Sequence, residues 1–288
     1  MPSNKDSARP KKTPTPTKTA LRAERAKIAI PHPGMQFGYK HQIFISKLKR
    51  GEVWALNNLS DKAKVAVTPL FEMWPPNPAT KTKPAKSLSV HTTGLMEYLA
   101  NEWTGLPCYI DTKYLVAGGG PSPANAQAVF NIARTLKVNA IPVTSPYFAP
   151  AFQQIIRNVI STDKRGVMFR LPLAFFNDPQ QIAGYLDGLA AALGVNRNQV
   201  DILIDLEYRP NVIEVQQMGS YCLNALPSIA DWRTVTLASG CFPSTISDEV
   251  TGSWIPFARS DWNGWNTVAG HDLPPEISTI RTWSSLVI

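Results

Sequence analysis

The stretch GVMFRLPLAFFNDPQQIAGYLDGLAAALGVNRNQVDILIDLEY, residues 166–208, decides the fold because it contains one complete strand–helix–strand unit. Its two ends, residues 166–173 and 200–208, are short and nearly continuous apolar runs, which is typical of parallel strands buried on both faces. Residues 177–194 between them have the apolar spacing of a helix. We therefore predict a βαβ unit, the building block of a parallel sheet.

The helix of this unit has clear signals at both ends. Asn177 or Asp178 can accept hydrogen bonds from the first free backbone N–H groups, and Pro179 suits the first helical position. Gly194 suits the left-handed conformation that commonly ends a helix. The residues expected to face the core are Ile182, Tyr185, Leu186, Leu189 and Leu193.

The same alternation extends in both directions from this unit. Further strands are expected at residues 41–47, 66–74, 107–115, 139–148 and 233–240. Further helices are expected at residues 51–63, at 89–103, from 123, around 152–159 and at 211–226. Strand–helix pairs that recur about every 30 residues predict repeated βα units around a parallel sheet.

Two architectures fit such units: an open doubly wound sheet and a (β/α)8 barrel. A dinucleotide-binding open sheet needs a G-x-G-x-x-G motif after its first strand, but residues 47–52, KLKRGE, follow it here. The glycines at 118–120 lack that spacing, and no GxxxxGK[ST] phosphate-binding loop occurs. About 250 residues is also the usual barrel length. We predict an α/β, TIM-barrel-like repeat that forms one domain over residues 35–288.

The composition is that of a globular protein with an uneven charge. The 288 residues are 44% hydrophobic, which excludes a mostly disordered chain, and the three cysteines form no CxxC pair, which excludes a zinc finger. Of the net charge of +8, residues 1–33 hold +6, from eight basic and two acidic side chains, so the other 255 residues carry only +2. We predict that residues 1–34 form a disordered basic leader rich in Pro, Thr and Lys.

This leader allows two interpretations. It is either a solvated tail or a basic arm in which residues 1–27 bind nucleic acid. It lacks the apolar segment of a secretory signal, and no stretch reaches 18 apolar residues, so no membrane span is expected. Together with free thiols, these features predict a cytoplasmic protein.

Two segments near the start of the predicted barrel, KHQIFISKLKRGEVWAL (40–56) and VTPLFEM (67–73), resemble the opening of the phage beta-protein family. Similar pieces follow in the same order at 110–115, 170–173, 204–208, 239–243 and 255–265. The resemblance implies a TIM-barrel-like fold and an association with phages and mobile elements, but no agreed enzymatic activity. Members usually continue into a Gly-Asp-Tyr strand and a further helical part, which residues 270–288 do not contain. We therefore expect seven clear strand–helix units, with the eighth reduced or absent.

Candidate catalytic residues lie where the predicted strands end, because barrels place their sites at the carboxyl ends of the strands. Four carboxylates fall there: Glu72, Asp111, Asp205 and Glu207. As general acid, general base or ligands of a hard cation such as Mg²⁺, they would fit a hydrolase of phosphoesters or glycosides. No other cofactor is expected, and the four histidines lack metal-ligand spacing.

Five cationic residues lie at or near the same ends: Lys47, Lys49, Lys113, Arg170 and Arg259. They can bind the phosphate or carboxylate of an anionic ligand. The alternative is that carboxylates and cations form structural ion pairs around the mouth. Our leading hypothesis is a protein of phage–host conflict whose barrel mouth binds an anionic ligand or a protein partner. A hydrolase and a nucleic-acid-binding accessory protein are the alternatives.

Two further features have competing interpretations. Cys241 lies in a loop and is the most plausible reactive thiol, although free cysteines usually pack as small hydrophobes. Trp262 and Trp265 are three residues apart and are expected to share one helix face, as a helix anchor, a protein-contact surface or a stacking platform for bases or sugars. The same interpretations apply to Trp74.

Overall fold

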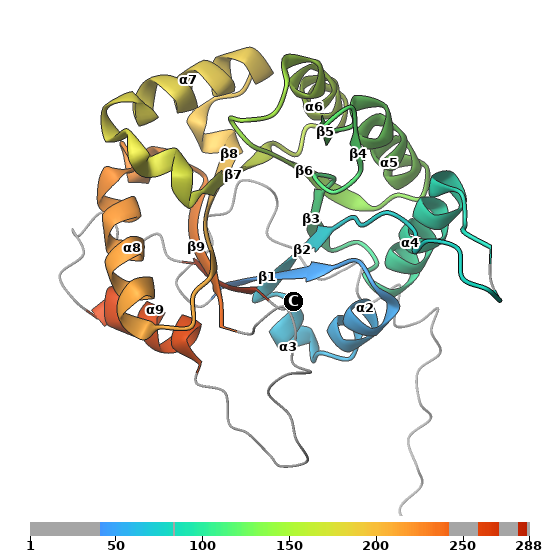
Figure 1. Cartoon of the computed structure of the whole chain (residues 1–288), viewed down its shortest axis with the longest axis horizontal. Coiled ribbons are helices and arrows are strands. Elements are labelled where there is room, and N and C mark those ends of the chain that lie inside the picture. Colours follow the sequence, from blue (N-terminus) through green and yellow to red (C-terminus); the bar gives the residue numbers. More distant parts are fainter. Residues whose placement is uncertain (1–40, 83, 242–258, 271–281, 287–288) are drawn as a thin grey trace, which may run out of the picture.

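The computed structural model describes residues 41–82, 84–241, 259–270 and 282–286. Eight parallel strands form a closed barrel in the order β1-β10-β9-β8-β7-β6-β3-β2 (Figure 1). The strands are β1 Gln42–Lys47, β2 Val67–Glu72, β3 Pro107–Asp111, β6 Asn139–Thr144, β7 Val167–Pro172, β8 Val200–Tyr208, β9 Thr234–Gly240 and β10 Thr282–Leu286. The predicted leader, residues 1–34, lies outside the described residues, so its disorder stays a prediction.

Helices surround the barrel as an outer layer (Figure 1). They are α2 Arg50–Asn57, α3 Asp61–Lys64, α4 Leu88–Glu102, α5 Pro123–Thr135, α6 Pro150–Asp163, α7 Ile182–Leu193, α8 Val212–Ala225 and α9 Ser260–Gly270. A small antiparallel hairpin, β4 Val116–Ala117 with β5 Gly120–Pro121, follows β3. The predicted TIM-barrel-like fold is therefore confirmed. The helix expected at 51–63 is divided into α2 and α3 at Ser60, whose hydroxyl caps α3.

The eighth unit is reduced to a strand in the part of the chain that the structure describes. Strand β10 pairs in parallel with β1, where Gln42 faces Trp283, and with β9, where Thr236 faces Thr282. This strand closes the barrel because it satisfies the edges that β1 and β9 would otherwise expose. Sequence analysis did not identify it, since TWSSL is short and half polar.

The apolar side chains form two buried layers, as barrel geometry requires. The larger layer fills the space between strands and helices. The smaller one fills the inside of the barrel and consists of Ile43, Ile45, Leu70, Tyr109, Ile141, Val143, Met168, Leu203 and Ala238. The described residues therefore fill the inside of the barrel as a packed core.

The helix of the deciding stretch begins later than predicted. Two 3₁₀ turns, Leu173–Asn177 and Pro179–Gln181, precede α7, which starts at Ile182. Phe175 and Phe176 are buried within the first turn, so tertiary packing sets the path of this segment in place of the Asn177 or Asp178 cap. Gly194 ends α7 in the left-handed conformation, as expected.

Two exposed aromatic residues, Tyr185 and Trp262, differ from what the sequence predicted. Tyr185 of α7 is 55% exposed, although the other four residues of its predicted stripe are buried. On α9, Trp265 is buried and Trp262 is 48% exposed, so the two do not share one buried face. A separation of three residues leaves a rotation of about 60° around the helix axis, which is enough to place one ring outside the contact.

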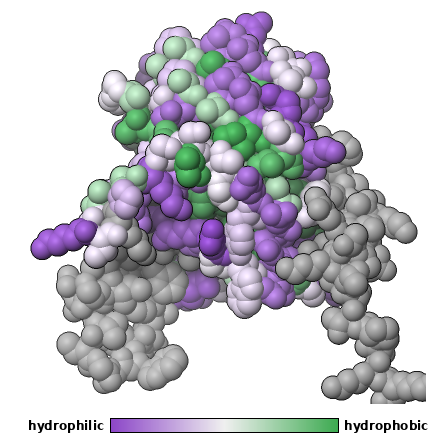
Figure 2. Space-filling view, turned by 90° about the vertical axis from the view of Figure 1, so that its right-hand side faces the viewer, coloured by the Kyte–Doolittle hydropathy of each residue, from purple (hydrophilic) through white to green (hydrophobic). Residues whose placement is uncertain are grey.

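The outer surface shows no membrane-spanning element among the described residues. None of the helices in these ranges combines the length and the apolar character needed to cross a membrane. Figure 2 shows the side that carries α4 and α5, where hydrophobic and hydrophilic residues are interspersed.

Helices α8 and α9 approach each other through Gly264. A Cβ atom there would lie 2.5 Å from Cγ1 and 2.6 Å from Cβ of Val215 on α8. We expect Gly264→Ala to lower the free energy of unfolding by about 1–3 kcal/mol, because overpacking forces backbone shifts. The matched control is Gly188→Ala on α7, where nothing lies within 4 Å and helix propensity predicts a gain of up to about 1 kcal/mol. Urea denaturation measures both, and equal effects would contradict the predicted close contact.

Candidate functional site

Arg170 forms the centre of the barrel mouth. It lies on β7, near the carboxyl end, and its side chain is 7% exposed. Its Nη1 group donates to Oε1 of Glu72 at 2.7 Å and to Oδ2 of Asp111 at 2.8 Å. Its Nη2 lies 2.6 Å from Oδ2 of Asp205. Three of the four predicted carboxylates, from β2, β3 and β8, thus meet on one guanidinium group, which we call the arginine cluster.

The arginine cluster is charged and balanced almost to neutrality. Lys113 adds a second cation, with its Nζ 3.3 Å from Oε1 of Glu72, so the three carboxylates face two cations. Burial alone would raise the pKa of Asp205, but Arg170, Lys113 and a backbone N–H outweigh it and hold that pKa below its ordinary value. Burial opposes the charge of Arg170, yet the carboxylates raise its pKa well above the usual range. Arg170 and Asp205 therefore stay ionised at neutral pH.

This geometry matches the structural ion-pair alternative. The guanidinium of Arg170 contacts Glu72, Asp111 and Asp205, and it occupies the space between them. An anionic ligand would have to compete with these three carboxylates for Arg170. Among the described residues, no group of three or more His, Cys, Asp or Glu side chains has the arrangement of a metal site. The predicted roles of these carboxylates in catalysis or Mg²⁺ binding stay predictions.

Glu207, the fourth predicted carboxylate, does not contribute its side chain to the cluster. The register of β8 shifts between Asp205 and Tyr208, and Glu207 adopts a φ of 60°, which is unusual for a residue with a side chain. Its side chain is exposed. Its backbone N–H donates to Oδ1 of Asp205 at 2.9 Å, so Glu207 supports the arginine cluster through the main chain.

A stack of cations and aromatic rings adjoins the arginine cluster. The rings of Trp74 and Tyr114 are stacked, with centroids 4.1 Å apart. The Nζ of Lys47 lies 4.4 Å from the centroid of Trp74, and the Nζ of Lys113 lies 4.7 Å from that of Tyr114. We call these four residues the aromatic stack. Because Lys113 also contacts Glu72, the stack links the arginine cluster to the surface.

A pocket of about 450 Å³ lies beside the outer end of the aromatic stack. It is formed by the segment that leads from β1 into α2, by the loop between β2 and α4, and by the first turns of α4. Among the described residues, its charged lining consists of Lys47, Lys49, Arg50 and Lys86 and includes no Asp or Glu. Trp74 and the prolines of the second loop provide apolar walls. We call this cavity the basic pocket.

Comparison with known protein families shows which family the chain belongs to. A family model described as Beta protein matches residues 43–278. The chain belongs to the Beta protein family. This range includes every predicted catalytic and ligand-binding residue, and it confirms the resemblance seen in the sequence. No curated protein sequence matches the chain.

In this Beta protein family member, two predicted ligand residues lie inside the basic pocket and three lie elsewhere. Lys47 and Lys49 line it, together with Arg50 and Lys86, which sequence analysis did not single out. The available signal was the Pro- and Lys-rich composition of residues 75–86. Sequence reasoning also did not pair Trp74 with Tyr114, because the two rings are far apart in the chain.

Arg259, the remaining predicted cation, belongs to a separate group with Asp261 and Cys241. Two nitrogen atoms of Arg259 donate to the carboxylate of Asp261, each at 2.8 Å. Burial and a hydrogen bond with Asp261 raise the pKa of the Cys241 thiol to about 11. The thiol is therefore protonated at neutral pH, and a nucleophilic thiolate is disfavoured. The geometry of this family member favours the packing interpretation of Cys241.

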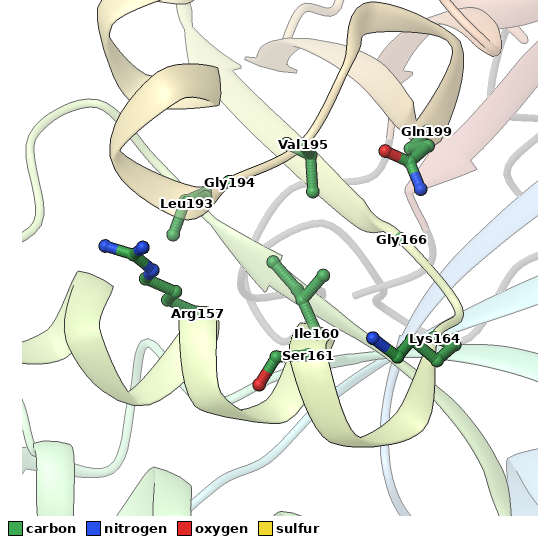
Figure 3. A pocket seen from close by; sticks show the side chains of 9 residues that line it. All are labelled: Arg157, Ile160, Ser161, Lys164, Gly166, Leu193, Gly194, Val195 and Gln199. Carbon is green, nitrogen blue, oxygen red and sulfur yellow. The ribbon is translucent and has the colours of Figure 1, made fainter.

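A second cavity, of about 230 Å³, lies at the opposite end of the barrel, where α6 and α7 end (Figure 3). Figure 3 shows Ile160 and Val195 pointing toward each other across it. Lys164 is the C-cap residue of α6, and Arg157, from the middle of α6, reaches Gly194 at the carboxyl end of α7. Cations are favourable at such helix ends because the last carbonyl groups are unpaired. Helix-end electrostatics therefore accounts for both cations, and we place the candidate site at the mouth.

Proposed function

We propose that this Beta protein family member binds an anionic ligand in the basic pocket at the barrel mouth. One observation carries the proposal: in the part of the chain that the structure describes, four cationic side chains and no carboxylate line a single cavity. Residues 34–288 carry a net charge of only +2, so this concentration is local. Concave sites lined by one sign of charge raise the local concentration of counter-ions and ligands.

The pocket's cations are better placed for a ligand than those of the arginine cluster. No salt bridge in the described part of the chain joins Lys49 or Lys86 to a carboxylate, whereas Arg170 contacts three. An exposed ammonium group can replace its bound water with a charge-assisted hydrogen bond to a ligand at little cost in free energy. An anion is therefore expected to bind in the basic pocket more tightly than at Arg170.

The other hypotheses have weaker support. A hydrolase would need Asp205 and its neighbours to bind a substrate or metal, yet their oxygen atoms already accept from Arg170. Nucleic-acid binding through residues 1–27 concerns residues outside those described. A role in phage–host conflict rests on the family resemblance alone, and we propose it as the setting in which the ligand is bound.

The test is the binding of inorganic tripolyphosphate to the full chain, measured by titration calorimetry. We expect Lys49→Gln/Lys86→Gln to weaken binding about 10- to 100-fold, because each charge-assisted contact contributes about 1.5–3 kcal/mol before screening by water. Binding is also expected to weaken with salt.

The matched control is Lys62→Gln/Lys164→Gln, which removes the same charge from exposed positions, one of them at the second cavity. This pair is expected to change the affinity less than 2-fold. Absence of binding to the wild-type chain, or equal weakening by both pairs, would refute the proposed function.

A further inference from the structure

We infer that the ligand of the basic pocket is a nucleoside phosphate, whose base stacks on Trp74 and whose phosphates pair with the surrounding lysine and arginine side chains. This inference rests on the proposed function. It specifies that the ligand has an aromatic base in addition to its anionic group, which the charges of the pocket alone do not indicate.

Trp74 provides a platform that is already held in place. Trp74 is 37% exposed and belongs to the pocket wall, while the ring of Tyr114 stacks on its ring with an angle of 25° between them. Prolines 75, 76 and 78 directly follow it and line the same pocket, and their fixed φ angles stiffen the loop. A ring that is fixed before binding loses little conformational freedom when a ligand stacks on it.

A base can replace the group that now lies near the ring. The Nζ of Lys47 lies 4.4 Å from the centroid of Trp74. An exposed contact of this kind contributes a factor of about 2 to 5, whereas stacking of a base on an aromatic side chain contributes a factor of about 5 to more than 100. The displaced ammonium group stays in the pocket and can pair with a phosphate. The exchange is therefore favourable for a ligand that combines a planar ring with phosphates.

The remaining cations are placed around the platform from different elements. Lys49 and Arg50 lie at the start of α2, and Lys86 lies just before α4, whose first turn contains no acidic residue. His91 of α4 also lines the pocket. A volume of about 450 Å³ is in the usual range for a small-molecule site. These features favour a free nucleoside phosphate over a nucleic-acid strand, because the charges gather in one cavity and not along a groove.

The test compares ATP with inorganic tripolyphosphate, which has the same phosphate chain without the nucleoside. Calorimetry on the full wild-type chain is expected to show ATP binding at least 10-fold more tightly. Trp74→Leu is expected to weaken ATP binding about 10-fold and to change tripolyphosphate binding less than 2-fold. Trp74→Phe, which keeps a stacking ring, is expected to retain most of the affinity for ATP.

The matched control is Trp54→Leu, since Trp54 on α2 is 60% exposed and does not line the pocket. It should alter neither affinity. If ATP and tripolyphosphate bind equally, or if Trp74→Leu weakens both alike, the nucleoside assignment is wrong and the proposed anion binding still stands. If neither ligand binds, both proposals fail. A ten-nucleotide DNA strand that binds more than 10-fold more tightly than ATP would overturn the free-nucleotide inference in favour of a nucleic acid.

Discussion

Arg170→Met is expected to lower the free energy of unfolding by about 3–5 kcal/mol at neutral pH, measured by urea denaturation. The substitution leaves three buried carboxylates, Glu72, Asp111 and Asp205, without the guanidinium that binds them. Removing one partner of a buried ion pair lowers the stability by more than the intact pair adds to it. The reason is that the remaining charges stay buried and keep their desolvation penalty. The methionine fills a similar volume, so cavity formation contributes little to the expected loss.

The pH dependence of the free energy of unfolding separates the effect of the lost charge from the effect of altered packing. In the wild-type chain the pKa of Asp205 is lowered on folding, so its stabilisation is present above the unfolded pKa of about 4 and is lost as the pH falls below it. In Arg170→Met this carboxylate loses the partner that lowers its pKa. Burial, which raises the pKa of Asp205, then acts with less opposition, and protonation favours the folded state. We therefore expect the deficit of the variant to shrink between pH 7 and pH 4.

A matched arginine tests the specificity of this prediction. Arg134→Met removes a bidentate pair with Asp163 on the outer surface, where the arginine side chain is 38% exposed. Such pairs contribute about 0–1 kcal/mol. A loss for Arg170→Met that is no larger than that for Arg134→Met, or that does not depend on pH, would contradict the role of the arginine cluster.

Asp201→Ala is expected to have a similar effect at the opposite end of the barrel, with a loss of about 3–5 kcal/mol in the free energy of unfolding. Asp201 is fully buried at the start of β8 and binds the guanidinium of Arg233 with both carboxylate oxygens. It also accepts from the hydroxyl of Tyr109 at 2.7 Å and from that of Thr234 at 2.8 Å. The alanine variant leaves a buried cation and two hydroxyl groups without this acceptor.

Two further variants make this measurement decisive. Asp187→Ala removes the partner of Arg197 on the surface, where the Asp187 side chain is 51% exposed, and is expected to cost less than about 1 kcal/mol. Asp201→Leu/Arg233→Met removes both buried charges and is expected to recover part of the loss. A double variant as unstable as Asp201→Ala would show that packing, and not the unpaired charge, causes the effect.

The order of the elements follows from local sequence patterns. Short apolar runs and helical stripes repeat along the chain, and the seven predicted strands agree with the structure within a few residues. The carboxyl ends of two strands differ most: β3 ends at Asp111 where 115 was predicted, and β6 ends at Thr144 where 148 was predicted. The same reasoning indicated that Glu72, Asp111 and Asp205 lie at the mouth, since parallel strands place their carboxyl ends on one side of the barrel.

The contacts made by these residues depend on the register of the strands, which no local pattern contains. Strand β10 closes the barrel because β1 and β9 leave hydrogen-bonding edges for it, although its own sequence is a weak strand signal. Register also brings Arg170 within reach of three carboxylates, and a shift in β8 turns Glu207 away from them.

The sequence by itself thus determined a βα repeat with charged strand ends and a net charge that is concentrated in residues 1–33. Only the tertiary structure decided which of those charges neutralise one another in the arginine cluster and which remain available in the basic pocket. The physical reason is that hydrophobic periodicity acts over a few residues, whereas ion pairing acts between side chains that only strand pairing and loop packing bring together.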